Sequence, residues 1–218
     1  MSDDLKVRLD QVIATRENGD LQGSKLGFNE LLQQVNKSHE LYPRLMAEYV
    51  IQLRLEAKQI LDKALSIGQE LLNAQEQKPK PHPLSIRSVS NTLIDLGNFE
   101  QAIPLLQKLT KLYADNSLRL GETQAHLSYA YLRVSKVIDA FPLIEQAIHN
   151  INLNSQQEDY VEVRESYAYI VKALIENAAG KKDQANTSAN QALSIAQKGK
   201  ASHRIIQAQS VITFLSSQ

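Results

Sequence analysis

The sequence contains no cysteine and has no surplus of charge of either sign. Without cysteine the chain can form neither a disulfide nor a thiolate metal site, and it has no cysteine nucleophile. Its 24 Lys and Arg residues are balanced by 24 Asp and Glu residues, so the formal net charge is zero. This balance argues against nucleic acid as the main partner, because binding to phosphates requires a basic surplus or a dense basic stripe.

Long hydrophobic runs are missing as well. No segment approaches the ~18 consecutive apolar residues that a membrane-spanning helix needs. Residues 1–6 are polar and amphipathic and lack the apolar core of a secretion signal. We therefore expect a cytoplasmic protein with no membrane partner. The hydrophobic content of 43% is that of an ordinary folded chain rather than a disordered one.

Strictly alternating, β-branched segments are also missing, and helical periodicity takes their place. In residues 7–13, for example, apolar side chains recur every three to four positions and form one stripe. Gly19, Gly97, Gly180 and Gly199 each follow such a periodic stretch. A glycine in this place is typical of a left-handed C-terminal cap, so we expect these four residues to end helices.

These signals predict an all-α chain of about eleven helices. The predicted helices cover residues 3–17, 21–36, 40–52, 54–75, 84–96, 99–113, 117–134, 137–152, 156–179, 182–198 and 201–216. The start near residue 156 rests on Ser155 and Glu158, which have the spacing of a capping box. No glycine or proline marks the break near residue 53, so a single helix from 40 to 75 is the alternative.

Three prolines in the segment 76–83 interrupt the helical pattern. One interpretation is a long loop between repeats whose last proline, Pro83, opens the next helix. The other is a stiff, extended strip that serves as a recognition segment or a hinge.

The middle of the chain contains an internal sequence repeat. Residues 102–106 read Ala-Ile-Pro-Leu-Leu, and residues 140–144, which lie 38 positions later, read Ala-Phe-Pro-Leu-Ile. A repeat of this period indicates an array of helix pairs that bury their apolar faces by stacking on one another.

Around this internal repeat the sequence resembles the tetratricopeptide repeat (TPR) family. The best copy lies in residues 93–102, where Gly97, Phe99 and Ala102 occupy the turn glycine, the following aromatic and the helix-crossing alanine of the family pattern. Glycine permits the positive φ that ends the first helix, and alanine allows two helices to approach closely.

Alignment on the crossing alanine extends the resemblance to the whole chain. It pairs Ala140 with Ala147, Ala185 with Ala192, and Ala57 with Ala64, each pair seven residues apart and on one helix face. Ser24 occupies the same place in a degenerate N-terminal copy. The resemblance implies one domain over 1–218, a TPR-like superhelical solenoid of about five antiparallel helix hairpins. The repeats are best defined in 84–152, and the helix at about 201–216 would cap the array.

Catalytic signatures are not found. The sequence contains no nucleophile elbow, phosphate-binding loop, zinc-protease motif or dinucleotide fingerprint. Its five histidines are scattered, and Glu145 with His149 is most simply a surface pair one turn apart. We therefore predict no catalytic residue, no metal site and no cofactor.

In the TPR family the first helices of successive repeats line a concave groove that holds a peptide or a partner helix. The register of Ala102 and Ala140 implies that Arg87, Asn91, His126, Tyr129 and Arg133 lie on this face. Arg87 and Asn91 resemble the pair with which some members clamp a C-terminal carboxylate. His126 stands where the next repeat of such a clamp has asparagine, so Tyr129 and Arg133 are the favoured polar anchors.

The resemblance implies a non-enzymatic scaffold that presents a groove to a protein or peptide partner. One alternative is a receptor for short signalling peptides, because the repeats of such regulators are longer than 34 residues, as they are here. Another is a structural repeat protein that self-associates, a possible homo-oligomer, since the ends of a solenoid expose apolar faces. An enzyme is the remaining alternative.

Overall fold

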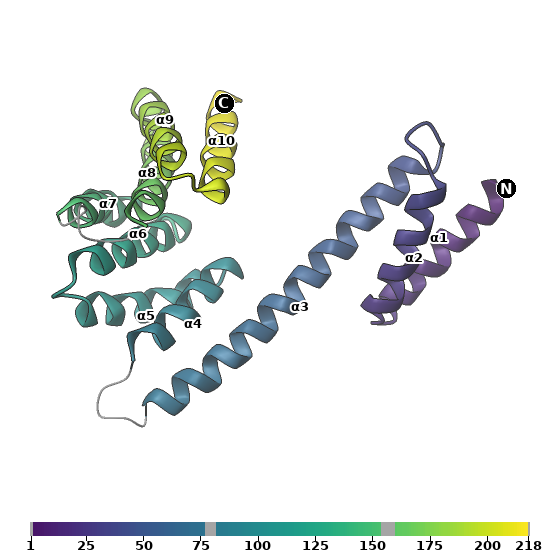
Figure 1. The fold of residues 1–218 in the computed structure, drawn as a ribbon, viewed down its shortest axis with the longest axis horizontal. Coiled ribbons are helices and arrows are strands. Elements are labelled where there is room, and N and C mark those ends of the chain that lie inside the picture. Colours follow the sequence, from purple (N-terminus) through teal and green to yellow (C-terminus); the bar gives the residue numbers. More distant parts are fainter. Residues whose placement is uncertain (1, 77–81, 154–159, 218) are drawn as a thin grey trace. The chain divides into compact units, whose positions relative to one another are not determined.

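The structure is a computed structural model that describes residues 2–76, 82–153 and 160–217. These residues form ten helices and no strand (Figure 1). The helices are α1 (Ser2–Glu17), α2 (Leu21–Gln34), α3 (Tyr42–Glu76), α4 (Pro83–Asp95), α5 (Phe99–Leu112), α6 (Ser117–Arg133), α7 (Val137–Asn152), α8 (Val161–Ala178), α9 (Lys182–Lys198) and α10 (Ser202–Ser216). None of the described helices combines the length and apolar character that crossing a membrane requires.

The chain divides into two compact units, Met1–Ser66 and Ile67–Gln218, which we call unit 1 and unit 2. The division falls inside α3, so each unit contains part of that helix. The single domain over 1–218 stays a prediction, and each unit is described by itself.

Unit 1 consists of the α1/α2 hairpin and the first part of α3. Its apolar core contains Leu9, Phe28, Leu31 and Leu45, which are all fully buried. Ser24, at the predicted crossing position, is also fully buried, and its hydroxyl donates to Gln52 Oε1 at 2.8 Å. The degenerate N-terminal copy therefore packs as a repeat hairpin.

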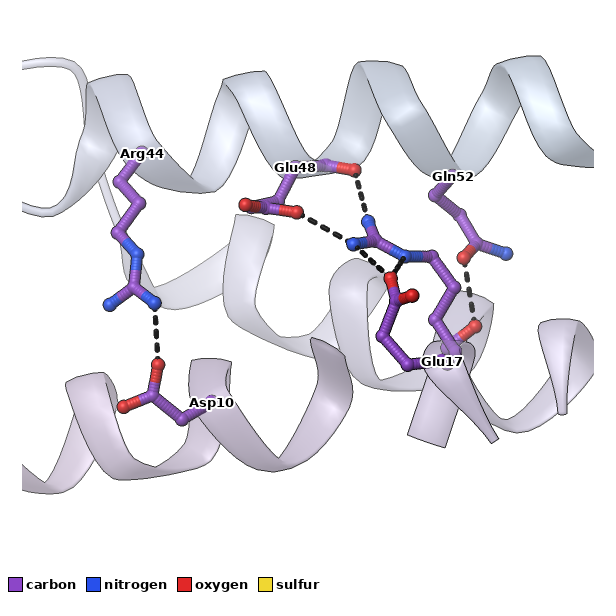
Figure 2. A network of polar contacts seen from close by, with 7 residues as sticks. Asp10, Glu17, Arg44, Glu48 and Gln52 are labelled. Atoms are coloured by element: carbon purple, nitrogen blue, oxygen red, sulfur yellow. Dashed lines mark hydrogen bonds and ion pairs between the residues drawn. The ribbon is translucent and has the colours of Figure 1, made fainter. Parts of the chain in front are cut away.

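Polar contacts bind α3 to this hairpin (Figure 2). The buried guanidinium of Arg16 donates to the backbone carbonyl of Glu48 at 3.0 Å and to its carboxylate at 2.8 Å. Arg44 of α3 pairs with Asp10 of α1 at 2.6 Å. Because a buried charge without a partner is costly, these contacts fix which face of α3 meets α1.

The break predicted near residue 53 is wrong, and the alternative of one long helix is confirmed: α3 runs through 35 residues. Gln52 explains the continuity. Its fully buried amide donates to the carbonyl of Leu21 at 2.8 Å and to Glu56 one turn later at 2.9 Å. A turn at residue 53 would separate Gln52 from Glu56.

Unit 2 contains the end of α3 and then three hairpins, α4/α5, α6/α7 and α8/α9, followed by α10, which packs on α9 and α8. Together with α1/α2, the described residues thus contain four hairpins rather than about five. The predicted crossing alanines of unit 2 are confirmed, because all five have no exposed surface. They are Ala102, Ala140, Ala147, Ala185 and Ala192.

The hairpin turns of the described residues and the turn between α9 and α10 share one backbone conformation. A residue with positive φ follows the first helix of each hairpin and also follows α9, and the next N–H donates to a carbonyl five positions back, as in the Schellman motif. At these five places the residue with positive φ is Gly19 (90°), Gly97 (79°), Ser135 (62°), Gly180 (77°) or Lys200 (51°). The prediction is confirmed for Gly19, Gly97 and Gly180.

Gly199 was predicted to adopt the left-handed conformation and does not, because its φ is −80° and Lys200 takes that role. A Cβ atom at Gly199 would lie 2.5 Å from the Cβ of Glu162. Glycine is required there for close packing against α8. Gly121 has the same function in α6, where a Cβ would lie 2.6 Å from the carbonyl oxygen of Ala147.

The register on Ala57 and Ala64 is also wrong, since both alanines are exposed on the continuous α3. Pro83 opens α4, as predicted for the last proline of its segment. Pro79, Pro81 and the capping box at 155–158 lie outside the described residues. The helix expected from residue 156 begins, in the described chain, at Val161.

Candidate functional site

Unit 2 contains a cavity of about 840 Å³. Its walls come mainly from the first helix of each hairpin of unit 2, α4, α6 and α8, and from the final helix α10, with Phe99 of α5 at one end. Ile170, Val171 and Val211 supply an apolar wall. The lining also contains polar, charged and aromatic residues, so the cavity can accommodate a ligand with both kinds of surface.

All five predicted binding residues line this cavity: Arg87, Asn91, His126, Tyr129 and Arg133. They come from α4 and α6, at helical spacings that put them on the same side of each helix. Two other residues of these helices, Leu84 and Ala125, do not line the cavity. Leu84 is exposed, and Ala125 is fully buried in the core.

Glu122 connects the three first helices. Its largely buried carboxylate pairs with Arg87 of α4, with Arg119 of its own helix at 3.2 Å, and with Arg164 of α8 at 3.1 Å. Burial acts to raise the pKa of Glu122, but the charges of Arg87 and Arg164 outweigh it and lower that pKa. Since Arg87 is held by this carboxylate, it is not a free cation for a carboxylate clamp.

Arg133 and two aromatic rings form one end of the cavity. The Arg133 guanidinium donates to the Tyr129 hydroxyl at 2.8 Å and lies 4.8 Å from the centre of the Phe99 ring. The Phe99 and Tyr129 rings meet edge to face, with centres 5.8 Å apart. Cation–π and edge-to-face contacts hold Arg133 in place although its side chain is exposed.

His126, Tyr167 and Arg204 form a second group, contributed by α6, α8 and α10. The His126 and Tyr167 rings stack at 4.5 Å, and the Arg204 guanidinium lies 4.4 Å from the Tyr167 ring. Burial lowers the pKa of His126 to about 4, so its imidazole is neutral at pH 7. Burial also raises the pKa of Tyr167 and lowers that of Arg204, whose guanidinium nevertheless stays charged at neutral pH.

Three buried polar atoms on these walls have no hydrogen-bond partner among the described residues. They are Asn91 Oδ1, His126 Nδ1 and Arg204 Nε. All three residues line the cavity. A buried polar atom left without a partner costs about 1–3 kcal/mol, so atoms of this kind gathered around one cavity are well placed to bind a ligand.

A smaller cavity of about 590 Å³ lies among α7, α8 and α9. It contains Glu145, which the sequence analysis paired with His149 one turn later. The Glu145 carboxylate accepts a contact from Lys172 Nζ at 2.7 Å. Within the described ranges, no three His, Cys, Asp or Glu side chains are grouped as a metal site would require.

No protein-family model matches the sequence, and a comparison with curated proteins finds no match. Solved structures do match. The nearly identical TPR-like repeats of a kinesin light chain-type protein from Podosopora anserina align with 92% of this chain and 98% of their own, at 16% identity and a TM-score of 0.50. BtubC (BKLC) from P. vanneervenii aligns over 99% of this chain and 88% of its own, at 13% identity and a TM-score of 0.51.

The chain has a TPR-like helical-repeat fold. At these identities the likeness concerns the fold alone. The TPR-like arrangement explains why the predicted residues meet, because the first helices of its hairpins line one surface. It also confirms the all-α repeat fold that the sequence predicts.

The sequence interpretation missed α10 as a wall of the site. Its residues at 201–216 were predicted only to cap the TPR-like array, yet Arg204, Gln207 and Val211 line the cavity. Their spacing of three and four residues is a signal of one shared helix face, and it was available in the sequence. No sequence pattern specifies that this face turns toward α6 and α8.

Proposed function

We propose that the protein is a non-enzymatic binding scaffold that holds a short segment of a peptide or protein partner in the unit 2 cavity. The observation that carries this proposal is the set of three buried polar atoms without partners, on Asn91, His126 and Arg204, around that cavity. A bound segment would supply their missing hydrogen bonds. The TPR-like fold supports a scaffold rather than a catalyst, because its stacked helices present a curved surface.

The chemistry of the three atoms specifies what the segment must offer. Asn91 Oδ1 accepts a hydrogen bond and therefore suits a backbone or side-chain N–H. Arg204 Nε donates, and the charged guanidinium favours a carbonyl or a carboxylate oxygen. The wall of Ile170, Val171 and Val211 suits an apolar side chain next to these polar groups.

The site is held ready before the ligand arrives. Glu122 ties α4, α6 and α8 together through Arg87, Arg119 and Arg164. A receptor whose walls are already fixed loses little conformational entropy on binding, which leaves more of the contact energy for affinity. His126, neutral at pH 7, keeps Nδ1 available as a hydrogen-bonding group without adding a buried charge.

The size of the cavity favours a second candidate, a receptor for short free peptides. A volume of about 840 Å³ lies within the range of pockets that enclose small ligands. Peptide length separates the two candidates. A scaffold for proteins should bind a motif equally well within a long chain, whereas a receptor for free peptides should require a free end.

Selection from a phage-displayed library of random peptides on the full-length protein tests the proposal. We expect the wild type to enrich a motif and Asn91→Leu or Arg204→Met to weaken binding of that motif at least tenfold. The matched controls lie outside the cavity, Asn190→Leu at an exposed position and Arg8→Met at a half-exposed one, and both should leave the affinity unchanged. An affinity that the cavity variants leave unchanged would place the binding elsewhere.

A further inference from the structure

The long helix α3 exposes an apolar stripe that no described residue covers. Its large members are Val50, Leu53, Ile60, Ile67 and Leu71, and Ile60 and Ile67 are 68% and 58% exposed. The exposed alanines Ala57 and Ala64, which do not form a repeat hairpin, complete the stripe. The seven residues are 50, 53, 57, 60, 64, 67 and 71.

The stripe has the period of a coiled coil. Its members alternate in steps of three and four residues through three heptads, with 50, 57, 64 and 71 at the a positions and 53, 60 and 67 at the d positions. The stripe lies on a single continuous helix, so it depends on the geometry of that helix only. From Val50 to Leu71 it extends about 32 Å.

Intramolecular contacts of α3 use positions other than a and d. Glu48 and Gln52, at heptad positions f and c, and Glu56, at the flanking position g, contact α1 and α2. Further along, a Cβ at Gly68, at position e, would lie 3.1 Å from Val89 of α4, and Leu72, at position b, is buried. The a and d positions therefore remain open to a second helix.

We propose that this stripe binds the same stripe of a second copy of the chain as an antiparallel two-helix coiled coil. The order of small and large residues supports this arrangement. When Ala57 faces Ile60 of the second copy, Ala64 faces Leu53 and Val50 faces Ile67. Each alanine then meets a large side chain, which packs the seam without gaps. A parallel pair in register would instead stack Ala57 on Ala57 and Ala64 on Ala64.

Charge complementarity selects the same register. In this register Lys63 lies opposite Glu56 of the second copy, at two symmetric places that flank the seam. Lys63 has no ion-pair partner among the described residues. Glu56 already accepts a contact from Lys25 at 2.7 Å, and a carboxylate can bind a second cation. A shift by one heptad would oppose Lys63 to Lys63 and Glu56 to Glu70, which places like charges together.

Sedimentation equilibrium of the full chain over a range of concentrations tests the proposal. We expect the wild type to reach twice the mass of one chain and Ile60→Asp to raise the dimer dissociation constant at least ~100-fold, because the seam would bury unpaired carboxylates. The matched control is Ile138→Asp on α7, where Ile138 is 89% exposed. It should dimerise like the wild type. A monomeric wild type, or an Ile60→Asp variant that dimerises as well as the wild type, would overturn the proposal.

Cross-linking tests the register, and the chain provides a clean background because it has no cysteine of its own. We expect mixed Leu53→Cys and Ala64→Cys chains to form a disulfide with each other under mild oxidation, since these positions face each other in the seam. Neither variant should cross-link on its own. Self-cross-linking of Ala64→Cys would show a parallel pair, and no cross-link in the mixture would exclude the register, so either result contradicts the proposal.

Discussion

Two pairs of alanines have the same spacing in the sequence and opposite surroundings in the structure. Ala140 and Ala147 on α7 have no exposed surface, because α6 and α8 pack against them. Ala57 and Ala64 on α3 are exposed. A seven-residue alanine spacing therefore does not by itself make a helix crossing.

The difference lies five residues upstream of the first alanine. Ser135, five positions before Ala140, has a φ of 62° and turns the chain between α6 and α7. Gln52, five positions before Ala57, is helical, and its buried amide binds Leu21 and Glu56. Without a turn at this position, no first helix folds back to cover the alanines, and they remain on an open face.

The largest effect should come from filling the closest approach in the α6/α7 hairpin. Gly121→Ala places a Cβ 2.6 Å from the carbonyl oxygen of Ala147, where backbone rather than a movable side chain stands in the way. We expect a loss of about 3 kcal/mol in the free energy of unfolding of unit 2, measured by amide hydrogen exchange.

Gly68→Ala on α3 is the matched control for this change. Its Cβ would lie 3.1 Å from a methyl group of Val89, which can shift, so we expect a change below about 1 kcal/mol. Equal effects at the two glycines would contradict the distinction between a backbone obstruction at Gly121 and a movable side chain at Gly68.

The two alanine pairs themselves provide the next test. Ala140→Leu overpacks a site with no free surface, so we expect a loss of about 2 kcal/mol in the stability of unit 2. Ala57→Leu should leave the stability of the monomer within about 0.5 kcal/mol, because the new side chain lies in solvent. Urea unfolding of both variants measures the difference. A large loss for Ala57→Leu would mean that α3 is covered after all.

Mild acid should weaken unit 2 through His126. Its folded pKa of about 4 lies below the value of 6.5 for an unperturbed histidine, so the unfolded chain binds more protons between these two pH values. The contribution of the neutral His126 side chain to the stability of unit 2 is fully present above pH 6.5, and it is lost as the pH falls toward 4. After allowance for the partial exposure of the ring, we expect a loss of about 1.5 kcal/mol at pH 5.

Hydrogen exchange of α6 and α8 at pH 7 and pH 5, corrected for the intrinsic exchange rates, measures this loss. His126→Gln should remove most of the pH dependence in this range. If the variant keeps the dependence, a group other than His126 is responsible.

The smallest expected effect is a gain in stability. Ser135 is strained because it adopts a left-handed conformation, which glycine adopts without strain. Ser135→Gly should therefore stabilise the α6/α7 hairpin by about 1 kcal/mol. Gln52→Gly in the middle of α3 should destabilise unit 1, because the helix loses the buried amide contacts and gains a flexible residue. Thermal unfolding followed by circular dichroism compares the two variants. A glycine at 135 that destabilises the protein would contradict the assigned turn.

The sequence predicts those parts of the fold that depend on local chemistry. Gly19, Gly97 and Gly180 were predictable because glycine is the residue that favours a positive φ. Ser135 and Lys200 adopt the same conformation and were not, because only the surrounding packing imposes it on an ordinary residue.

In the candidate site, too, local features were predictable and contacts that depend on packing were not. Arg87 and Asn91 are four residues apart on one helix, so their common face follows from helical geometry. The pairing of Glu122 with Arg164 and the contact of Arg204 with Tyr167 join residues far apart in the sequence. Such contacts depend on how the helices pack, which no single-sequence pattern specifies.

The distance between spin labels on either side of residue 53 distinguishes a continuous α3 from a helix hairpin. Labels on cysteines at the exposed positions Ala47 and Asn73, measured by pulsed electron paramagnetic resonance in chains diluted with unlabelled protein, report whether α3 is continuous. An unbroken α3 predicts a label separation of about 39 Å. A separation of about 20 Å would mean that α3 folds back as a hairpin, which would contradict a continuous helix.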